Sequence, residues 1–136
     1  MESPKIQPSS LRPLILILRL SALYDWLWFI LLLAMPTWLF SLFSHPAPCS
    51  PFLFRLATLP LLVLPLVYLT AAETARRCPP LVDLSIAMRV TGALGILGIV
   101  FWHRPQGALA YCLLAAGDFV WAALYFFFAR RAASPR

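Results

Sequence analysis

Long runs of apolar residues make up most of the chain, and polar residues gather between them. Four runs are long enough to cross a hydrocarbon layer about 30 Å thick: residues 14–34, 52–72, 84–102 and 108–129. Each run is about twice the length of a barrel strand and lacks the alternation of one, and only helices and closed barrels satisfy their backbone groups in a membrane. The pattern therefore predicts an all-α fold, an antiparallel bundle of four transmembrane helices in one membrane domain over residues 1–136.

The composition supports this class. Hydrophobic residues make up 62% of the chain and charged residues 12%, whereas about a quarter of the residues of soluble domains are charged. The first run is followed by Met35-Pro36-Thr37 rather than by a small-residue cleavage site. We therefore expect a retained span and not a cleaved signal peptide.

The basic residues indicate how the chain is oriented. Seven of them lie before the first run, between the second and third, or after the fourth: Lys5, Arg12, Arg76, Arg77, Arg130, Arg131 and Arg136. The other two loops contain only Arg104. By the positive-inside rule, the sequence predicts a multi-pass protein of the cell (inner) membrane with both termini in the cytoplasm.

The net charge of +6 is then explained by topology and by affinity for the lipid bilayer, since each basic group near anionic headgroups contributes about 1 kcal/mol. No basic stripe with interleaved aromatic residues lies outside the runs, which argues against nucleic acid as a partner.

Each run contains a charged residue away from its cytoplasmic end: Asp25, Arg55, Arg89 and Asp118. Such residues cost ~2.5–3.5 kcal/mol at the centre of a span and usually face the bundle interior or one another. At about 1.5 Å per residue, Asp25 and Arg89 lie roughly 10–15 Å from the cytoplasmic ends, Asp118 slightly deeper and Arg55 near the outer face. The sequence therefore predicts that Arg89 pairs with Asp25, Asp118 or both.

Helical spacing supports a shared polar interior. Tyr111, Asp118 and Tyr125 recur every seven residues on the fourth run and thus share one face. The candidate polar site comprises Asp25, Arg89, Asp118, Tyr111 and Tyr125. Three roles stay open for it: an ion pair that fixes helix register, a site for a ligand, proton or substrate, and a contact with a partner.

The third run carries a row of small residues. Ala87, Thr91 and Gly95 follow one another at four-residue spacing, and Gly92 and Gly98 lie nearby. Such rows permit the backbone of another helix to approach closely, so we interpret these five residues as a helix-packing surface. On the second run, Pro60 and Pro65 predict a bend.

No motif for catalysis, metal binding or cofactor attachment occurs in the chain. Cys49, Cys78 and Cys112 form no C-x-x-C pair, so a disulfide is not expected. His45 and His103 lack the spacing of a metal site. We expect no catalytic residue, no metal and no evident cofactor.

Four segments carry a family resemblance: RLSALYD (19–25), MPTWLF (35–40), RVTGALG (89–95) and GDFVWA (117–122). In their order along nearly the whole chain, they are similar to small bacterial four-helix membrane proteins of the DoxX-like class. The resemblance implies the four-helix fold. Some DoxX-type proteins are subunits of quinone-linked oxidoreductases, so it also makes a quinone a possible ligand, although no family catalytic residue can be transferred to this chain.

Three functions are compatible with these observations. The first is a non-catalytic accessory or scaffold subunit of a membrane complex, which contacts other membrane protein subunits or a second copy of itself. The second is a subunit of a redox system that binds a quinone or another lipophilic ligand near Asp25, Arg89 and Asp118. The third, a small proton-coupled exporter, is less favoured because the dual insertion of such exporters depends on balanced loop charges. We favour the first and expect no enzyme activity.

Overall fold

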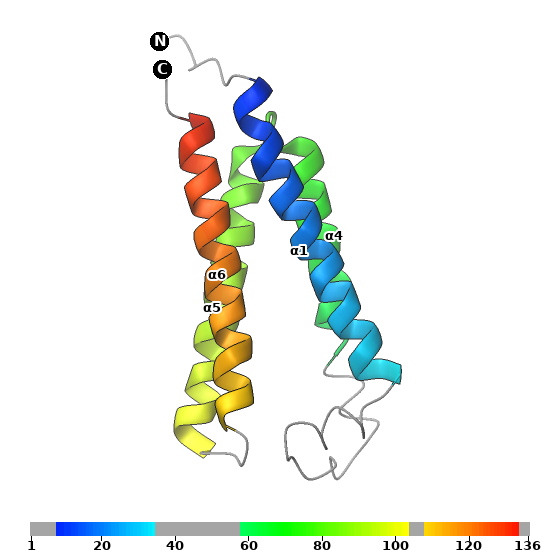
Figure 1. Ribbon diagram of the computed structural model, residues 1–136, viewed down its shortest axis with the longest axis vertical. Coiled ribbons are helices and arrows are strands. Elements are labelled where there is room, and N and C mark those ends of the chain that lie inside the picture. Colours follow the sequence, from blue (N-terminus) through cyan, green and yellow to red (C-terminus); the bar gives the residue numbers. More distant parts are fainter. Residues whose placement is uncertain (1–7, 35–57, 104–107, 134–136) are drawn as a thin grey trace.

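The computed structural model describes residues 8–34, 58–103 and 108–133. These residues form four helices (Figure 1): α1 (Pro8–Ala34), α4 (Pro60–Thr74), α5 (Pro79–His103) and α6 (Ala108–Ala133). Short turns complete the described part, which contains no strand. The prediction of an all-α fold is therefore confirmed for these residues.

Three of the four helices are long and apolar enough to cross a membrane, over Leu11–Leu33, Pro79–His103 and Tyr111–Ala133. The fourth, α4, is also apolar but has only 15 residues, which corresponds to about 22 Å. The expected second span began at residue 52, and residues 52–57 lie outside the described part. The structure thus contains three helices of spanning length and one shorter apolar helix.

Two prolines of the second span have different roles. Pro60 is the first residue of α4, where a proline suits the helix because the first amides have no intrahelical partner. Of the two prolines that predicted a bend, Pro60 therefore lies at the start of the described helix. Pro65 does lie inside α4 and is buried. Its missing amide removes one backbone hydrogen bond at the level where α4 begins to pack against its neighbours.

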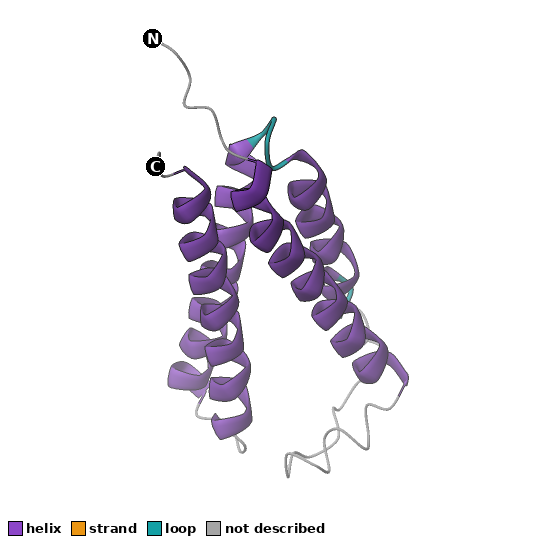
Figure 2. Ribbon diagram, turned by 45° about the horizontal axis from the view of Figure 1, so that its top comes forward, coloured by secondary structure: helices purple, strands orange, loops and turns teal. Residues whose placement is uncertain are grey.

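A tight connection joins α4 to α5 (Figure 2). The amides of Arg77 and Cys78 both donate to the carbonyl of Thr74, each at 2.8 Å. The pair Pro79-Pro80 then opens α5, since prolines are tolerated in the first turn. With so few residues between them, α4 and α5 run in opposite directions.

The helices form two antiparallel pairs, α1 with α4 and α5 with α6, and packing within each pair is more extensive than packing between the pairs. Contacts of α1 with α6 and of α4 with α5 join the pairs. The pairs lie together where α1 begins and α6 ends, and they diverge toward the other end (Figures 1 and 2).

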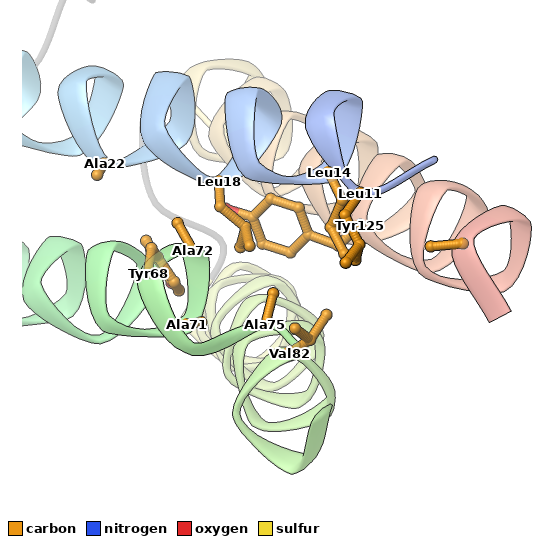
Figure 3. Close-up of a cluster of buried hydrophobic side chains, with 11 residues drawn as sticks. Leu11, Leu14, Leu18, Ala22, Tyr68, Ala71, Ala72, Ala75, Val82 and Tyr125 are labelled. Atoms are coloured by element: carbon orange, nitrogen blue, oxygen red, sulfur yellow. The ribbon is translucent and has the colours of Figure 1, made fainter. Parts of the chain in front are cut away.

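The apolar core lies at the end where the pairs meet. Figure 3 shows side chains of α1, α4 and α6 facing one another there. The core cluster consists of Leu11, Leu14, Leu18, Ala22, Tyr68, Ala71, Ala72, Ala75, Val82, Tyr125 and Ala132. Because small alanines alternate with leucines and tyrosines, the helices can approach closely at these positions.

Burial stops about halfway along the helices. Among the described side chains, the last buried residue in chain order is Asp25 on α1 and Ala93 on α5, which run away from the core. The first buried residue is Pro65 on α4 and Ala115 on α6, which run toward it. Beyond these positions the apolar side chains of α1 and α5 are largely exposed, among them Leu27, Ile30, Ile99 and Phe101. Within the four helices, the packed half therefore ends at the level of Asp25, although Thr58 in the turn before α4 is also buried.

Candidate functional site

Arg89 lies at the inner limit of this packed half. It belongs to the buried face of α5, together with Val82, Ser85 and Ala93. These positions follow helical spacing, so they share one side of α5. Since Arg89 is the only charged member of that face, the acceptors for its guanidinium N–H groups must come from the other helices.

Two carboxylates and a hydroxyl accept hydrogen bonds from this guanidinium. Nη2 of Arg89 lies 2.8 Å from each carboxylate oxygen of Asp25 on α1 and also donates to the hydroxyl of Ser21 on α1. Nη1 donates to Oδ1 of Asp118 on α6 at 2.6 Å. We call Asp25, Arg89 and Asp118 the charged triad. Through it, one side chain of α5 joins α1 and α6.

The fourth helix contributes an aromatic face. The ring of Tyr68 on α4 lies under the guanidinium, with 4.7 Å between its centroid and Cζ of Arg89. Tyr125 of α6 lies against Tyr68, with 5.9 Å between the ring centroids. A ring face attracts a cation, and the effect is largest where both groups are removed from water. All four helices thus contact the same guanidinium or its direct neighbours.

The members of the triad differ in exposure. Side-chain exposure is 2% for Asp25 and 5% for Arg89 but 20% for Asp118. Oδ2 of Asp118 lies 3.6 Å from the point where a Cβ of Gly92 would stand. No residue of the described part donates a hydrogen bond to this oxygen. Asp118 is therefore the accessible member, and Gly92 leaves room beside it.

Two buried polar atoms of the site lack a hydrogen bond of ordinary geometry to any described residue. They are Nε of Arg89 and the hydroxyl of Tyr125. The Tyr125 hydroxyl lies within hydrogen-bonding reach of Ser21 and Arg89, although the geometry to both is poor. Buried polar groups are rarely left without a partner. The site thus has unused hydrogen-bonding capacity next to the triad.

An aromatic group flanks the triad on α1 and α6. The ring of Tyr24 lies 6.1 Å from that of Trp28 and 5.8 Å from that of Trp121. The hydroxyl of Tyr24 lies 3.5 Å from the point where a Cβ of Gly117 would stand, next to Asp118 in sequence. A Cβ there would be in ordinary van der Waals contact with the hydroxyl, so Tyr24 lies against α6 at the level of the triad.

The structure brings some of the residues expected at the site together and leaves others apart. The pairing of Arg89 with both aspartates is confirmed by the two ion pairs. Tyr125 lies beside the guanidinium, whereas the half-buried Tyr111 lies about 10 Å before Asp118 along α6. Arg55 lies outside the described residues. A ligand-binding role for this cluster stays a prediction.

The small-residue row of α5 lies on the outside of the chain. Its five residues are all exposed: Ala87, Thr91, Gly92, Gly95 and Gly98. A Cβ at Gly95 or Gly98 would meet no atom within 4 Å. Within the described part, α5 instead packs through the face that carries Arg89. Packing of the row against another helix stays a prediction that concerns a partner outside this chain.

Sequence reasoning missed Tyr68. It recurs with Pro65 and Ala72 at three- and four-residue spacing, which places all three on one face of α4. A tyrosine on an otherwise small-residue face of a span is a signal that could have identified it. Reasoning from the sequence also did not identify the exposed ion pair of Arg19 with Glu73, 2.8 Å apart, which joins α1 to α4.

The cysteines expected to stay unpaired are free where the structure describes them, namely Cys78 and Cys112. Cys49 and His45 lie outside the described residues. In the described part, no three side chains of histidine, cysteine, aspartate or glutamate are grouped as metal ligands. The charged triad is therefore the main buried polar cluster of the described part.

No family model matches the chain, and neither a curated protein nor a solved structure is similar to it. The geometry of the triad and of the helix surfaces is therefore the basis for a proposed function.

Proposed function

We propose that the chain is a four-span protein of the cell membrane, with both termini in the cytoplasm, and that it acts as a non-catalytic accessory or scaffold subunit. The single observation that carries this proposal is the exposed row of small residues on α5. In a bilayer, such a face is where the backbone of a second helix can approach most closely. The row has no such neighbour within the described part of the chain.

The charged triad supports a structural role in this proposal. Arg89 is bound on one side by Asp25 and Ser21 and on the other by Asp118. A one-residue slip of α5 turns the guanidinium by about 100° around the helix axis and removes it from both carboxylates. The triad thus favours one register of α5 against α1 and α6, as buried polar groups do in some helical assemblies. A fixed register keeps the outer face of α5 in a constant position.

The fourth span rests on the sequence of residues 52–72, a largely apolar run in which Arg55 is the only charged residue. With an even number of spans, α1 begins and α6 ends on the same side, which agrees with their positions in Figure 1. The predicted resemblance to DoxX-like proteins agrees with the same arrangement.

The proposal can be tested by purifying the native chain and a Gly95→Leu variant in a mild detergent and measuring mass and composition by native mass spectrometry. The native chain should carry a second copy or another membrane protein in fixed stoichiometry. Gly95→Leu should lose it, because a leucine would separate the backbones. It should keep the fold, since a Cβ there meets nothing within 4 Å.

Val120→Leu is the matched control, because Val120 is 58% exposed on α6 and lies on another helix. This control should retain the partner. A native chain that is monomeric and without a protein partner in detergent and in nanodiscs would contradict the proposal. Retention of the partner by Gly95→Leu would show that the row is not the contact.

A second candidate is a subunit that binds a lipophilic molecule, with a quinone as one possibility. The observation that favours it is the partial exposure of Asp118 at the end of the packed half. Polar groups that converge at the edge of an apolar region are typical of ligand sites. Extraction of the purified protein and mass spectrometry of the extract tests this candidate. A quinone in stoichiometric amount would support it, and an extract with bilayer lipids alone would contradict it.

A further inference from the structure

The charged triad contains two carboxylates and one guanidinium. With all three groups ionised, it carries one negative charge in excess. The other ion pair of the described helices, Arg19 with Glu73, is neutral as a pair and is more than half exposed on both sides. An excess charge inside a membrane protein is costly unless a cation neutralises it. The geometry therefore calls for one further positive group.

The position of Asp118 determines where such a group can bind. Asp25 uses both carboxylate oxygens on Arg89, whereas Asp118 uses only Oδ1. Oδ2 of Asp118 lies beside the exposed Gly92. A second donor can reach this oxygen without displacing Arg89.

A second and independent feature also indicates a missing partner. The hydroxyl of Tyr125 is fully buried next to Ser21 and Arg89 and has no hydrogen bond of ordinary geometry to a described residue. Besides its proton, this oxygen has lone pairs that can accept a hydrogen bond. This hydroxyl adds to the incompletely used hydrogen-bonding groups of the site.

The surroundings favour an amphiphile rather than a hydrated metal ion. Beyond the level of the triad, α1 and α5 expose leucine, isoleucine and phenylalanine side chains. The rings of Tyr24, Trp28 and Trp121 lie at the same level. Aromatic faces attract organic cations, and apolar side chains accommodate an alkyl tail.

We propose that Asp118 binds the ammonium group of an amphiphilic amine, with its alkyl tail among the exposed apolar side chains beyond the level of the triad. The inference deepens the lipophilic-ligand candidate by naming its chemical class, and it does not depend on the scaffold role. The amine neutralises the excess charge of the triad, while Arg89 and Asp25 remain paired as they are.

The probe is n-decylammonium, with n-decanol as its uncharged analogue, added to the full chain in nanodiscs of phosphatidylcholine. Saturable binding above that of empty nanodiscs is measured by equilibrium dialysis and by tryptophan fluorescence. We expect one amine bound per chain and little binding of decanol. Asp118→Asn should weaken amine binding at least about tenfold, since a hydrogen bond to a charged group contributes this much.

Three variants separate folding from binding. Asp118→Asn leaves the neutral pair of Arg89 with Asp25, so it should fold like the native chain. Asp118→Glu keeps a carboxylate and should retain amine binding. Asp83→Asn removes an exposed carboxylate at the start of α5 and should bind like the native chain.

Equal amine affinity in the native chain and in folded Asp118→Asn would overturn the inference. So would the absence of saturable amine binding to the native chain, because a proton alone would then neutralise the triad. If decanol bound as tightly as the amine and both bound equally to Asp118→Asn, a lipophilic-ligand site would stand and the ammonium site would be rejected.

Discussion

Arg89 has two carboxylate partners on two different helices, Asp25 on α1 and Asp118 on α6. One carboxylate is sufficient to neutralise a guanidinium. The second therefore adds a link between helices rather than a charge that Arg89 needs. This redundancy makes the effect of a substitution depend on how many charges remain unpaired.

Asp25→Asn and Asp118→Asn should each cost only about 1 kcal/mol of unfolding free energy, because an amide keeps a hydrogen bond and the other aspartate still pairs with Arg89. The double variant should cost ~3–5 kcal/mol, since it leaves a buried guanidinium with no carboxylate. Steric trapping in bicelles can measure these free energies. Additive effects of the two single variants would contradict the shared pairing.

Arg89→Leu should be the most damaging single change at the triad, because it leaves two buried carboxylates with no cation. We expect a loss of ~3–5 kcal/mol, largely recovered in the triple variant with Asp25→Asn and Asp118→Asn. Arg19→Leu is the matched control. Its pair with Glu73 is exposed and should contribute ~0–1 kcal/mol. A triple variant no more stable than Arg89→Leu would show that packing, not charge, determines the loss.

At the scale of the helix, each buried face follows three- and four-residue spacing. On α1 the buried apolar residues are Leu11, Leu14, Leu18 and Ala22, and on α6 Ala115 and Ala122 lie seven residues apart with Asp118 between them. Such spacing matches the ridges and grooves of two helices that cross at small angles. The faces of α1 and α6 could therefore be predicted from the sequence.

The buried face of α5 was harder to predict. The sequence offers two faces, one with Ser85 and Arg89 and one with Ala87, Thr91 and Gly95. Both are compatible with helix packing. The structure buries the first, because a guanidinium is far more costly in lipid than a glycine or an alanine. Sequence spacing alone could not show which of the two faces is buried, since it does not show which helix lies against each face.

Ala71 provides a test of the packing between α1 and α4. It is fully buried in the core cluster, so Ala71→Leu inserts a larger side chain where no space exists. Overpacking of this kind should cost ~1–3 kcal/mol of unfolding free energy. Val63→Leu on the same helix is the control, since Val63 is 55% exposed, and should change stability little. Equal effects of the two substitutions would contradict the close packing of α4 on α1.

At the scale of the molecule, the packed core and the exposed basic residues are concentrated at the same end. The core occupies the end at which α1 begins and α6 ends. Exposed arginines surround this end: Arg12, Arg76, Arg77, Arg130 and Arg131. The guanidinium of Arg130 stacks on Phe126, 5.1 Å from the ring centroid. The sequence predicted this basic end, but not the divergence of the helix pairs, which depends on contacts between helices far apart in the chain.

The orientation in the membrane can be tested with single-cysteine variants and a membrane-impermeant maleimide. We expect Cys78 to react only after cells are permeabilised, because the basic connection between α4 and α5 should lie in the cytoplasm. Cys49 should react in intact cells. Reporter enzymes fused to the C-terminus give an independent measurement. Labelling of Cys78 in intact cells would reverse the proposed orientation.

The positions of the triad along the chain also have a consequence for biosynthesis. Asp25 is translated 64 residues before Arg89, and Asp118 follows Arg89 after 29 more. During synthesis α1 therefore reaches the membrane well before its counter-charge exists. Arg89, by contrast, enters with Asp118 on the neighbouring helix of the same hairpin. Until the α5–α6 hairpin arrives, α1 thus carries the cost of an unpaired aspartate, ~2.5–3.5 kcal/mol at the centre of a span.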